Sequence, residues 1–476
     1  MSTQNPLTLV TPVNPEKLPR LRKILESMKE TLEKGNHVLM DFEKASDIHY
    51  LRWLIIDDKN SPFTKEEDKG RSPKLVYSSN FDGSVEKHLD DLSSDGLKPI
   101  QDPNHPHAID PNENLMDQIY GCCTDYPEPG NRTPDTRKKF FKANIVKVAA
   151  FYRGSPRRSV KQILQENDLR IHLKQLLEDR PWNGATALEM HRTLQKEILE
   201  DPKFSWAKEK FKMPRINYFK LGLLGLVILI LLPVVLIWVI IVQLGYEKKD
   251  KYYENYRSDL NAEKVEILEE YEDLTAGENT DESDPHVKNM VINYQNQFSQ
   301  LVDLKPGKVR RITFKAMMLF ARVLIPIQFV DGRLMNIPTI HFARWVLFDD
   351  EKRVLFFSNF DGSWQQYLGD FIDQSGWGLT AIFSNTTVFP KTNWLGLTGI
   401  LSMRNIMPTS KNFFPGGAYN EEHFLAWSRD TELPTDIWYS AYPELSIKNV
   451  NNNSWIRVLL QKNLNKKKAK KFFELI

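Results

Sequence analysis

The hydrophobic pattern of the chain is dominated by one apolar run, 221–244, in which about two dozen residues pass without a charged side chain. As a helix this run measures roughly 36 Å, enough to cross a hydrocarbon core of about 30 Å. The pattern therefore predicts a membrane segment. Pro233, near its middle, leaves two alternatives open: one kinked spanning helix, or a re-entrant hairpin with about 11 residues in each arm.

Elsewhere, one unusual strand pattern occurs twice: IHYLRWLIIDD begins at Ile48, and IHFARWVLFDD begins at Ile340. Four further pairs of similar segments keep the same order along the chain. They begin at Asn5 and Asn296, at Ser79 and Ser358, at Ile119 and Ile382, and at Ser159 and Ser446. Because chance similarity does not keep five segments in order, the chain contains two copies of one unit.

The rhythm of each copy predicts its elements. In the first copy an apolar strand (7–10) precedes an amphipathic helix, and two strands with alternating apolar positions follow (48–56 and 75–79). The segment NFDGS then ends a strand and opens a helix, whose free amides Asp82 or Ser84 would cap.

A last strand near Ile119, and near Ile382 in the second copy, would complete the order β-α-β-β-α-β of a ferredoxin-like unit. The chain thus resembles the dimeric α/β-barrel superfamily, and IHFARWV with NFDGSW also resembles an uncharacterised group of bacterial membrane proteins. The resemblance implies an α+β fold in which two ferredoxin-like repeats pair as a pseudo-twofold barrel, with a membrane helix or re-entrant hairpin between them. The wider superfamily includes haem-dependent chlorite dismutases, dye-decolourising peroxidases and cofactor-free monooxygenases.

The repeat and the apolar run together predict six regions. They are a first ferredoxin-like repeat (1–180), a helical juxtamembrane connector (181–217), the membrane segment (218–245), an acidic linker (246–290), a second repeat (291–462) and a basic tail (463–476). A single crossing would place the repeats on opposite sides of the bilayer, where they cannot share a barrel. A hairpin would leave both on one side, and we therefore favour an intrachain barrel.

Composition and charge narrow the partners. With 64 basic and 62 acidic side chains the formal net charge is +2, which argues against a nucleic-acid partner. The only cysteines, Cys122 and Cys123, are adjacent and cannot easily pair, so a reducing compartment is the simpler interpretation. The first residues lack the pattern of a secretory signal, and basic residues precede the apolar run, so we expect a membrane protein whose N-terminal domain is cytoplasmic.

The side chains that both copies retain are the candidate site. Strict alternation puts His49 and Trp53 on one face of the strand and Arg52 on the other. We expect His49 and His341 to act as catalytic or ligand groups inside the barrel. The expected ligand-binding residues are Arg52, Trp53, Arg344, Trp345, Asp82 and Asp361. The alternative is structural: histidines packed under tryptophans, and arginines paired with Asp82 or Asp361.

Cofactor and reaction stay open. No metal site is expected, because no His and Cys spacing matches one. Haem remains an alternative, for which His172 has helical surroundings. The leading expectation is a membrane-anchored barrel that binds, and as an oxidoreductase oxidises, a small apolar or lipid-derived molecule. The alternative is a non-catalytic membrane-associated scaffold, and a homo-oligomer is open in both cases.

Two more stretches indicate membrane lipid as a partner. The first, ITFKAMMLFARVLIPIQFV from Ile312, is apolar apart from Lys315 and Arg322, and it would lie either in a membrane surface or against the core. The second is the lysine-rich tail, which would either approach an anionic leaflet or stay in water.

Overall fold

The computed structural model describes residues 4–33, 47–59, 70–97, 110, 112–247, 295–392 and 416–476. The predicted acidic linker lies almost wholly outside these residues. The chain has a mixed α+β fold built on two four-stranded antiparallel sheets. The first sheet has the order β1 (Gln4–Pro12), β3 (Lys74–Asp82), β2 (Ile48–Ile56) and β8 (Ile437–Ser440). The second has the order β4 (Val148–Arg153), β6 (Ile340–Phe348), β7 (Arg353–Asp361) and β5 (Gln295–Asp303).

The two halves of the chain exchange their last strands. β4 belongs to the first half but pairs with β6 of the second, and β8 of the second half pairs with β2 of the first. Just before each exchanged strand, the chain also bridges the first strand of its own half, at Leu9 with Ile145 and at Gln300 with Glu432. The halves therefore interlock, and neither sheet is complete without the other half.

The prediction of a last strand near Ile119 and Ile382 is wrong. Ile119 lies in helix α3 (Leu115–Tyr120), and Ile382 lies near the end of helix α10 (Trp364–Phe383). The Asn114 side chain accepts hydrogen bonds from the backbone amides of Met116 and Asp117, which starts α3 as a capped helix. Apolar residues at short spacing did not distinguish the short helix α3 from a strand.

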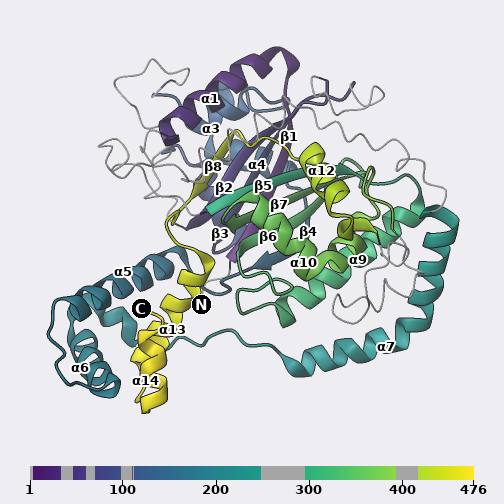
Figure 1. Ribbon diagram of the computed structural model, residues 1–476. Helices are drawn as coiled ribbons and strands as arrows, with labels where there is room; N and C mark the ends of the chain where they lie inside the picture. Colours follow the sequence, from purple (N-terminus) through teal and green to yellow (C-terminus); the bar gives the residue numbers. More distant parts are fainter. Residues whose placement is uncertain are drawn as a thin grey trace.

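Helices cover the outer face of each sheet and bury its apolar side chains (Figure 1). Those on the first sheet are α1 (Leu18–Glu33), α2 (Val85–Ser93), α3 and α4 (Pro134–Ala143). Those on the second are α9 (Lys308–Gln328), α10 and α12 (Glu421–Thr431). Helix α9 thus packs against the core with Phe314, Met318 and Ile325, as one of the two alternatives for the segment from Ile312 expected. Another side of the helix is exposed.

A separate helical cluster lies beside the sheets, at the lower left of Figure 1. It comprises α5 (Val160–Glu178), α6 (Ala187–Glu200), the 3-10 segment Pro202–Lys208, α13 (Ile447–Leu460) and α14 (Lys466–Phe473). The lysine-rich tail is therefore helix α14, which buries Ala469 and Phe472 in the cluster and exposes its five lysines. The segments expected as connector and tail join in one small core.

One helix in the described part of the chain is long and apolar enough to cross a membrane. It is α7 (Tyr218–Ile240), continued by a π-helical turn (Ile241–Tyr246). The helix passes through Pro233 without reversing, so the hairpin alternative is not what this segment forms. It runs along the outside of the molecule and bends, and α7, described throughout, buries none of its side chains (Figure 1).

Candidate functional site

A β-bulge places His49 and His341 in positions that strict alternation does not predict. The pairing of β2 with β3 shifts register between Ile48 and Tyr50, and the pairing of β6 with β7 shifts at the equivalent place. A bulge adds one residue to one strand and re-aims its side chain. His49 therefore contacts Phe342 of the other half, with ring centroids 5.3 Å apart, whereas Trp53 packs into the helix-covered core.

His49 connects the two halves through a tyrosine and a carboxylate. Its Nδ1 lies 2.8 Å from the Tyr442 hydroxyl, and its Nε2 lies 3.3 Å from Asp82 Oδ1. Burial raises the pKa of Tyr442 well above its usual value; the Tyr50 hydroxyl opposes this shift, and the charges of Asp82 and Asp361 add to it, so the Tyr442 hydroxyl keeps its proton. The histidine ring is wholly enclosed.

The carboxylates of NFDGS join the histidines to helices further along the chain. Asp82 Oδ2 accepts a hydrogen bond of 2.8 Å from the amide of Val160, the first residue of α5. Asp361 Oδ2 accepts one of 2.8 Å from the amide of Ile447, the first residue of α13. The helices directly after NFDGS are instead capped by serines, Ser84 and Ser363. Each aspartate therefore links a strand to a distant helix N-terminus, where a negative charge is favourable.

The second histidine has a different environment. His341 Nε2 lies 2.7 Å from Asp361 Oδ1, but its buried Nδ1 has no hydrogen-bond partner in the described part of the chain. Counting back from the helix caps Ser159 and Ser446, the residue equivalent to Tyr442 is Ser155. A serine in place of a tyrosine cannot extend as far into the interior. The two halves of the site therefore differ at the histidine Nδ1, which contacts a tyrosine hydroxyl at His49 but not at His341.

The two arginines of the repeated strand cross between the halves in opposite directions. Arg52 donates to Gln297 Oε1 at 2.9 Å and to the Ser358 carbonyl at 2.9 Å, both in the second half. Arg344 donates to the carbonyls of Leu7 at 2.7 Å and Ser79 at 2.8 Å, both in the first half. The alternative that arginines pair with Asp82 or Asp361 is not what these contacts show, because both carboxylates face the histidines.

Burial dominates the electrostatics of these arginines. Desolvation, followed by repulsion from Arg52, lowers the pKa of Arg344 to about 9. Both guanidinium groups lie near the same ring, Phe357, at 5.2 Å for Arg52 and 6.0 Å for Arg344. Each arginine therefore links the two halves through buried hydrogen bonds, and its guanidinium group is not open to an anionic ligand.

The tryptophans of the repeated strand do not join this site. Trp53 packs on the helix side of the first sheet, where its Nε1 donates to Tyr120 Oη at 3.4 Å. Trp345 packs on the helix side of the second sheet, with its ring centroid 4.9 Å from that of Phe356. Two of the six expected ligand-binding residues thus belong to the outer cores.

Three residues of the site were missed by sequence reasoning: Tyr50, Tyr442 and Gln295. The Tyr50 hydroxyl donates to Gln295 Oε1 at 2.9 Å, and Gln295 Nε2 donates to the Tyr442 carbonyl at 2.9 Å. Tyr442 reaches the first sheet only because β8 is exchanged, and no local pattern carries that information. Strict alternation along the strand puts Tyr50 on the opposite face from His49, and the bulge between Ile48 and Tyr50 removes that separation.

The Asp-Asp pairs that follow the repeated strands also contact the other half. Asp58 accepts two hydrogen bonds from Arg353, at 2.7 and 2.9 Å. Asp349 accepts from Lys74 at 2.7 Å. No metal-binding group of three or more His, Cys, Asp or Glu side chains occurs within the described ranges. One aspartate of each pair, Asp58 or Asp349, therefore forms an ion pair with the other half, whereas Asp57 pairs with Arg22 of its own half.

Besides the two arginines, apolar side chains of both sheets fill the space between the sheets. They are Leu54, Ile56, Val76, Val346, Phe348, Leu355 and Phe357. His172, considered as a haem ligand, lies outside this space in the helical cluster, where its ring is 5.1 Å from that of Phe204.

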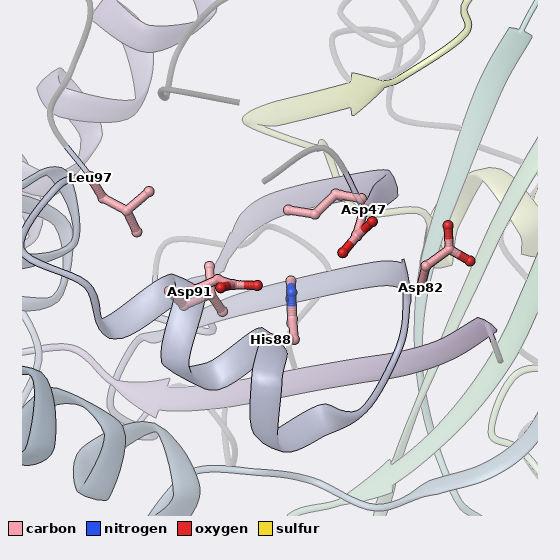
Figure 2. A pocket seen from close by; sticks show the side chains of 7 residues that line it. Asp47, Asp82, His88, Asp91 and Leu97 are labelled. Atoms are coloured by element: carbon pink, nitrogen blue, oxygen red, sulfur yellow. The ribbon is translucent and has the colours of Figure 1, made fainter. Parts of the chain in front are cut away.

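A small pocket opens at the margin of the first sheet, and Figure 2 shows its polar lining of Asp47, Asp82, His88 and Asp91. Its cavity volume of about 10 Å³ admits one water-sized molecule. His88 stacks on Phe81 with centroids 3.8 Å apart, and its Nε2 lies 2.9 Å from Ser79 Oγ. Burial, and then the charge of Lys87, lowers the pKa of His88 to about 3.

No family model matches the chain, and no curated protein or solved structure matches it either. The geometry itself must therefore support any function.

Proposed function

We propose that this protein is a non-catalytic scaffold associated with a membrane, in which the repeated His and Arg residues hold the two halves together. One observation carries the proposal. The two repeated arginines, which were expected to meet a substrate, are buried and contact the opposite half of the same chain: Arg52 donates to Gln297, and Arg344 donates to Ser79. A ligand entering between the sheets would have to displace these contacts.

We further propose that the interlocked sheets form a pseudo-twofold dimeric α/β barrel of ferredoxin-like units. The bridges that join Leu9 to Ile145 and Gln300 to Glu432 support this, because they continue pairing from one sheet to the next. Closing the sheets in this way leaves few free edges, which suits a rigid platform.

The test is to replace His49 with Ala and measure both stability and membrane association. A structural role predicts that the free energy of unfolding falls by about 2–4 kcal/mol, because Asp82 and Tyr442 lose a buried partner. Flotation with membranes should be unchanged. His172→Ala, a change in the helical cluster, is the matched control and should alter stability by less than about 1 kcal/mol. Unchanged stability of His49→Ala would contradict the scaffold interpretation.

A second function, binding a small apolar molecule with one polar group, is favoured by the unpartnered Nδ1 of buried His341. A ligand hydroxyl would supply there what Tyr442 supplies to His49. The absorption spectrum of the purified protein and extraction of bound small molecules test this proposal. Recovery of a stoichiometric ligand that disappears in His341→Ala would favour binding, and a Soret band would indicate haem.

A further inference from the structure

We propose that α7 lies in the plane of one leaflet and does not cross the bilayer, and that an exposed stripe of α9 enters the same leaflet. The inference deepens the proposed membrane association and rests on it. The occupant of this surface is a lipid bilayer rich in anionic head groups.

Strand exchange gives the first argument. The helix α7 lies between the halves in sequence, after β4 and before β5. A single crossing would separate β4 from its partner β6 and β8 from its partner β2. Since the sheets need strands from both halves, both ends of α7 must return to the same side of the membrane.

Both ends of α7 are attached to the same neighbouring helix. At its start, the amide of Asn217 donates to the Ile327 carbonyl, 3.3 Å away, near the end of α9. Toward its end, Trp238 Nε1 donates to Thr313 Oγ1 at 2.9 Å, near the start of α9. The apolar helix therefore lies antiparallel to α9 and is held near both ends.

A buried charge cluster fixes the far end. Glu247, directly after the π-helical turn, lies against Arg310 of α9 and 3.3 Å from Lys305 Nζ. Its other oxygen accepts from the amide of Thr392 at 3.0 Å and from its hydroxyl at 2.8 Å. Such a cluster is costly to open because it would leave buried charges without partners. The end of α7 is thus not free to move to the opposite side of a bilayer.

The exposed side of α9 extends the apolar surface. Ile312, Leu319 and Val323 are 53%, 63% and 40% exposed, and with Ala316 they follow a helical spacing that places them on one side. If α7 crossed the bilayer, α9 and the sheet behind it would have to enter the hydrocarbon together. In the plane of one leaflet, only the outward stripe needs to be immersed.

The charges around α7 fit an anionic leaflet. The segment that leads into the helix exposes Lys208, Lys210, Lys212, Arg215 and Lys220. On α9, Lys315 and Arg322 are exposed beside the apolar stripe. An apolar face bordered by cations is the pattern of a helix that lies at the head-group level of anionic lipid.

Fluorescence quenching in vesicles of phosphatidylcholine and phosphatidylserine tests the immersion of both helices. The full chain is labelled at single cysteines replacing Leu229, Leu319 or Ile171, since Cys122 and Cys123 are buried and burial raises the pKa of both thiols. Brominated lipids should quench the labels at positions 229 and 319. They should leave the control at 171 unquenched, because Ile171 is a 49% exposed residue of the helical cluster.

Sidedness is tested in the same vesicles with a membrane-impermeant maleimide. Cysteines replacing Ser205 and Lys352, on either side of α7 in sequence and both exposed, should react from outside. Protection of one of them with quenching at 229 only would overturn the in-plane arrangement while leaving membrane association intact. Failure of the protein to float with vesicles at all would overturn both proposals.

Charge substitutions on the stripe provide the quantitative test. Leu319→Lys with Val323→Lys should weaken vesicle binding by roughly tenfold or more, because immersed apolar area is replaced by charge. Ile171→Lys should change binding by less than about twofold if that residue stays outside the leaflet. Equal effects of both substitutions would contradict a specific role for α9.

Discussion

At the scale of single residues, the molecule contains a natural comparison between its halves. His88 stacks on Phe81 in the first half, and Tyr367 stacks on Phe360 in the second, both with centroids 3.8 Å apart. Both residues occupy the fourth position of the helix that follows NFDGS. The stacking is therefore retained in both halves, while an imidazole, which titrates near neutral pH only in the unfolded chain, occupies this position in the first half alone.

We predict that His88 makes stability depend on pH below about 6.5. Its folded-state pKa of about 3 lies below the unfolded value of about 6.5, so the unfolded chain binds a proton first as the pH falls. The stabilisation is fully present above pH 6.5 and is lost progressively toward pH 3. Replacing His88 with Tyr, as in the other half, should flatten this dependence.

Denaturant unfolding of both proteins across this pH range is the measurement. Lys87→Gln is a useful control because it leaves the stack intact and removes the charge next to the imidazole. Parallel curves for the native protein and His88→Tyr would mean that His88 is not the titrating group.

A second prediction at this scale concerns Arg344. Arg344→Met fills a similar volume but leaves the carbonyls of Leu7 and Ser79 without their donor. We expect the free energy of unfolding to fall by about 2–4 kcal/mol. Arg333→Met, a change of the same chemistry at an exposed position, should have an effect within about 0.5 kcal/mol. Chemical denaturation at neutral pH measures both, and similar losses would show that burial is not the cause.

At the scale of elements, the apolar helix depends on its attachment to α9. We predict that Glu247→Gln, which removes the negative charge facing Lys305 and Arg310, lowers the free energy of unfolding by about 3–5 kcal/mol. The loss should be accompanied by faster proteolysis near the end of α7. Glu351→Gln, which removes an exposed ion pair with Lys315, is the control and should cost less than about 1 kcal/mol. An equal effect of both variants would show that the buried cluster does not hold the helix.

The elements also show how far the sequence could lead. The duplication, the strands 48–56 and 75–79 and the apolar helix follow from periodicity and agree with β2, β3 and α7. The bulge at His49 does not, because one additional residue in a strand leaves no mark in hydrophobic alternation. The exchanged strands β4 and β8 are short, and their partners lie in the other half of the chain, so local patterns could not assign them.

At the scale of the whole molecule, the halves should remain together after the chain is cut between them. We predict that a protease site inserted after Gly277 yields two fragments that co-elute under native conditions, because β4 and β8 each complete the other half's sheet. Size-exclusion chromatography before and after denaturation measures this. Deleting 437–440 removes β8, one of the two exchanged strands, and should lower the denaturant concentration at which the fragments separate, while β4 stays paired with β6. Separation of the two fragments without denaturant, while both exchanged strands are present, would contradict the interlocked arrangement.

The exchanged strand β8 has a consequence for the order in which the protein is made. His49 and its partner Tyr442 are 393 positions apart, so at about 5–20 residues per second the ribosome needs roughly 20–80 s to deliver the second after the first. During that interval the nascent first sheet exposes the edge of β2, and translation of α7 is complete about halfway through it. If α7 binds a lipid surface as soon as it leaves the ribosome, the nascent chain stays attached to the membrane until β8 is synthesised and completes the first sheet.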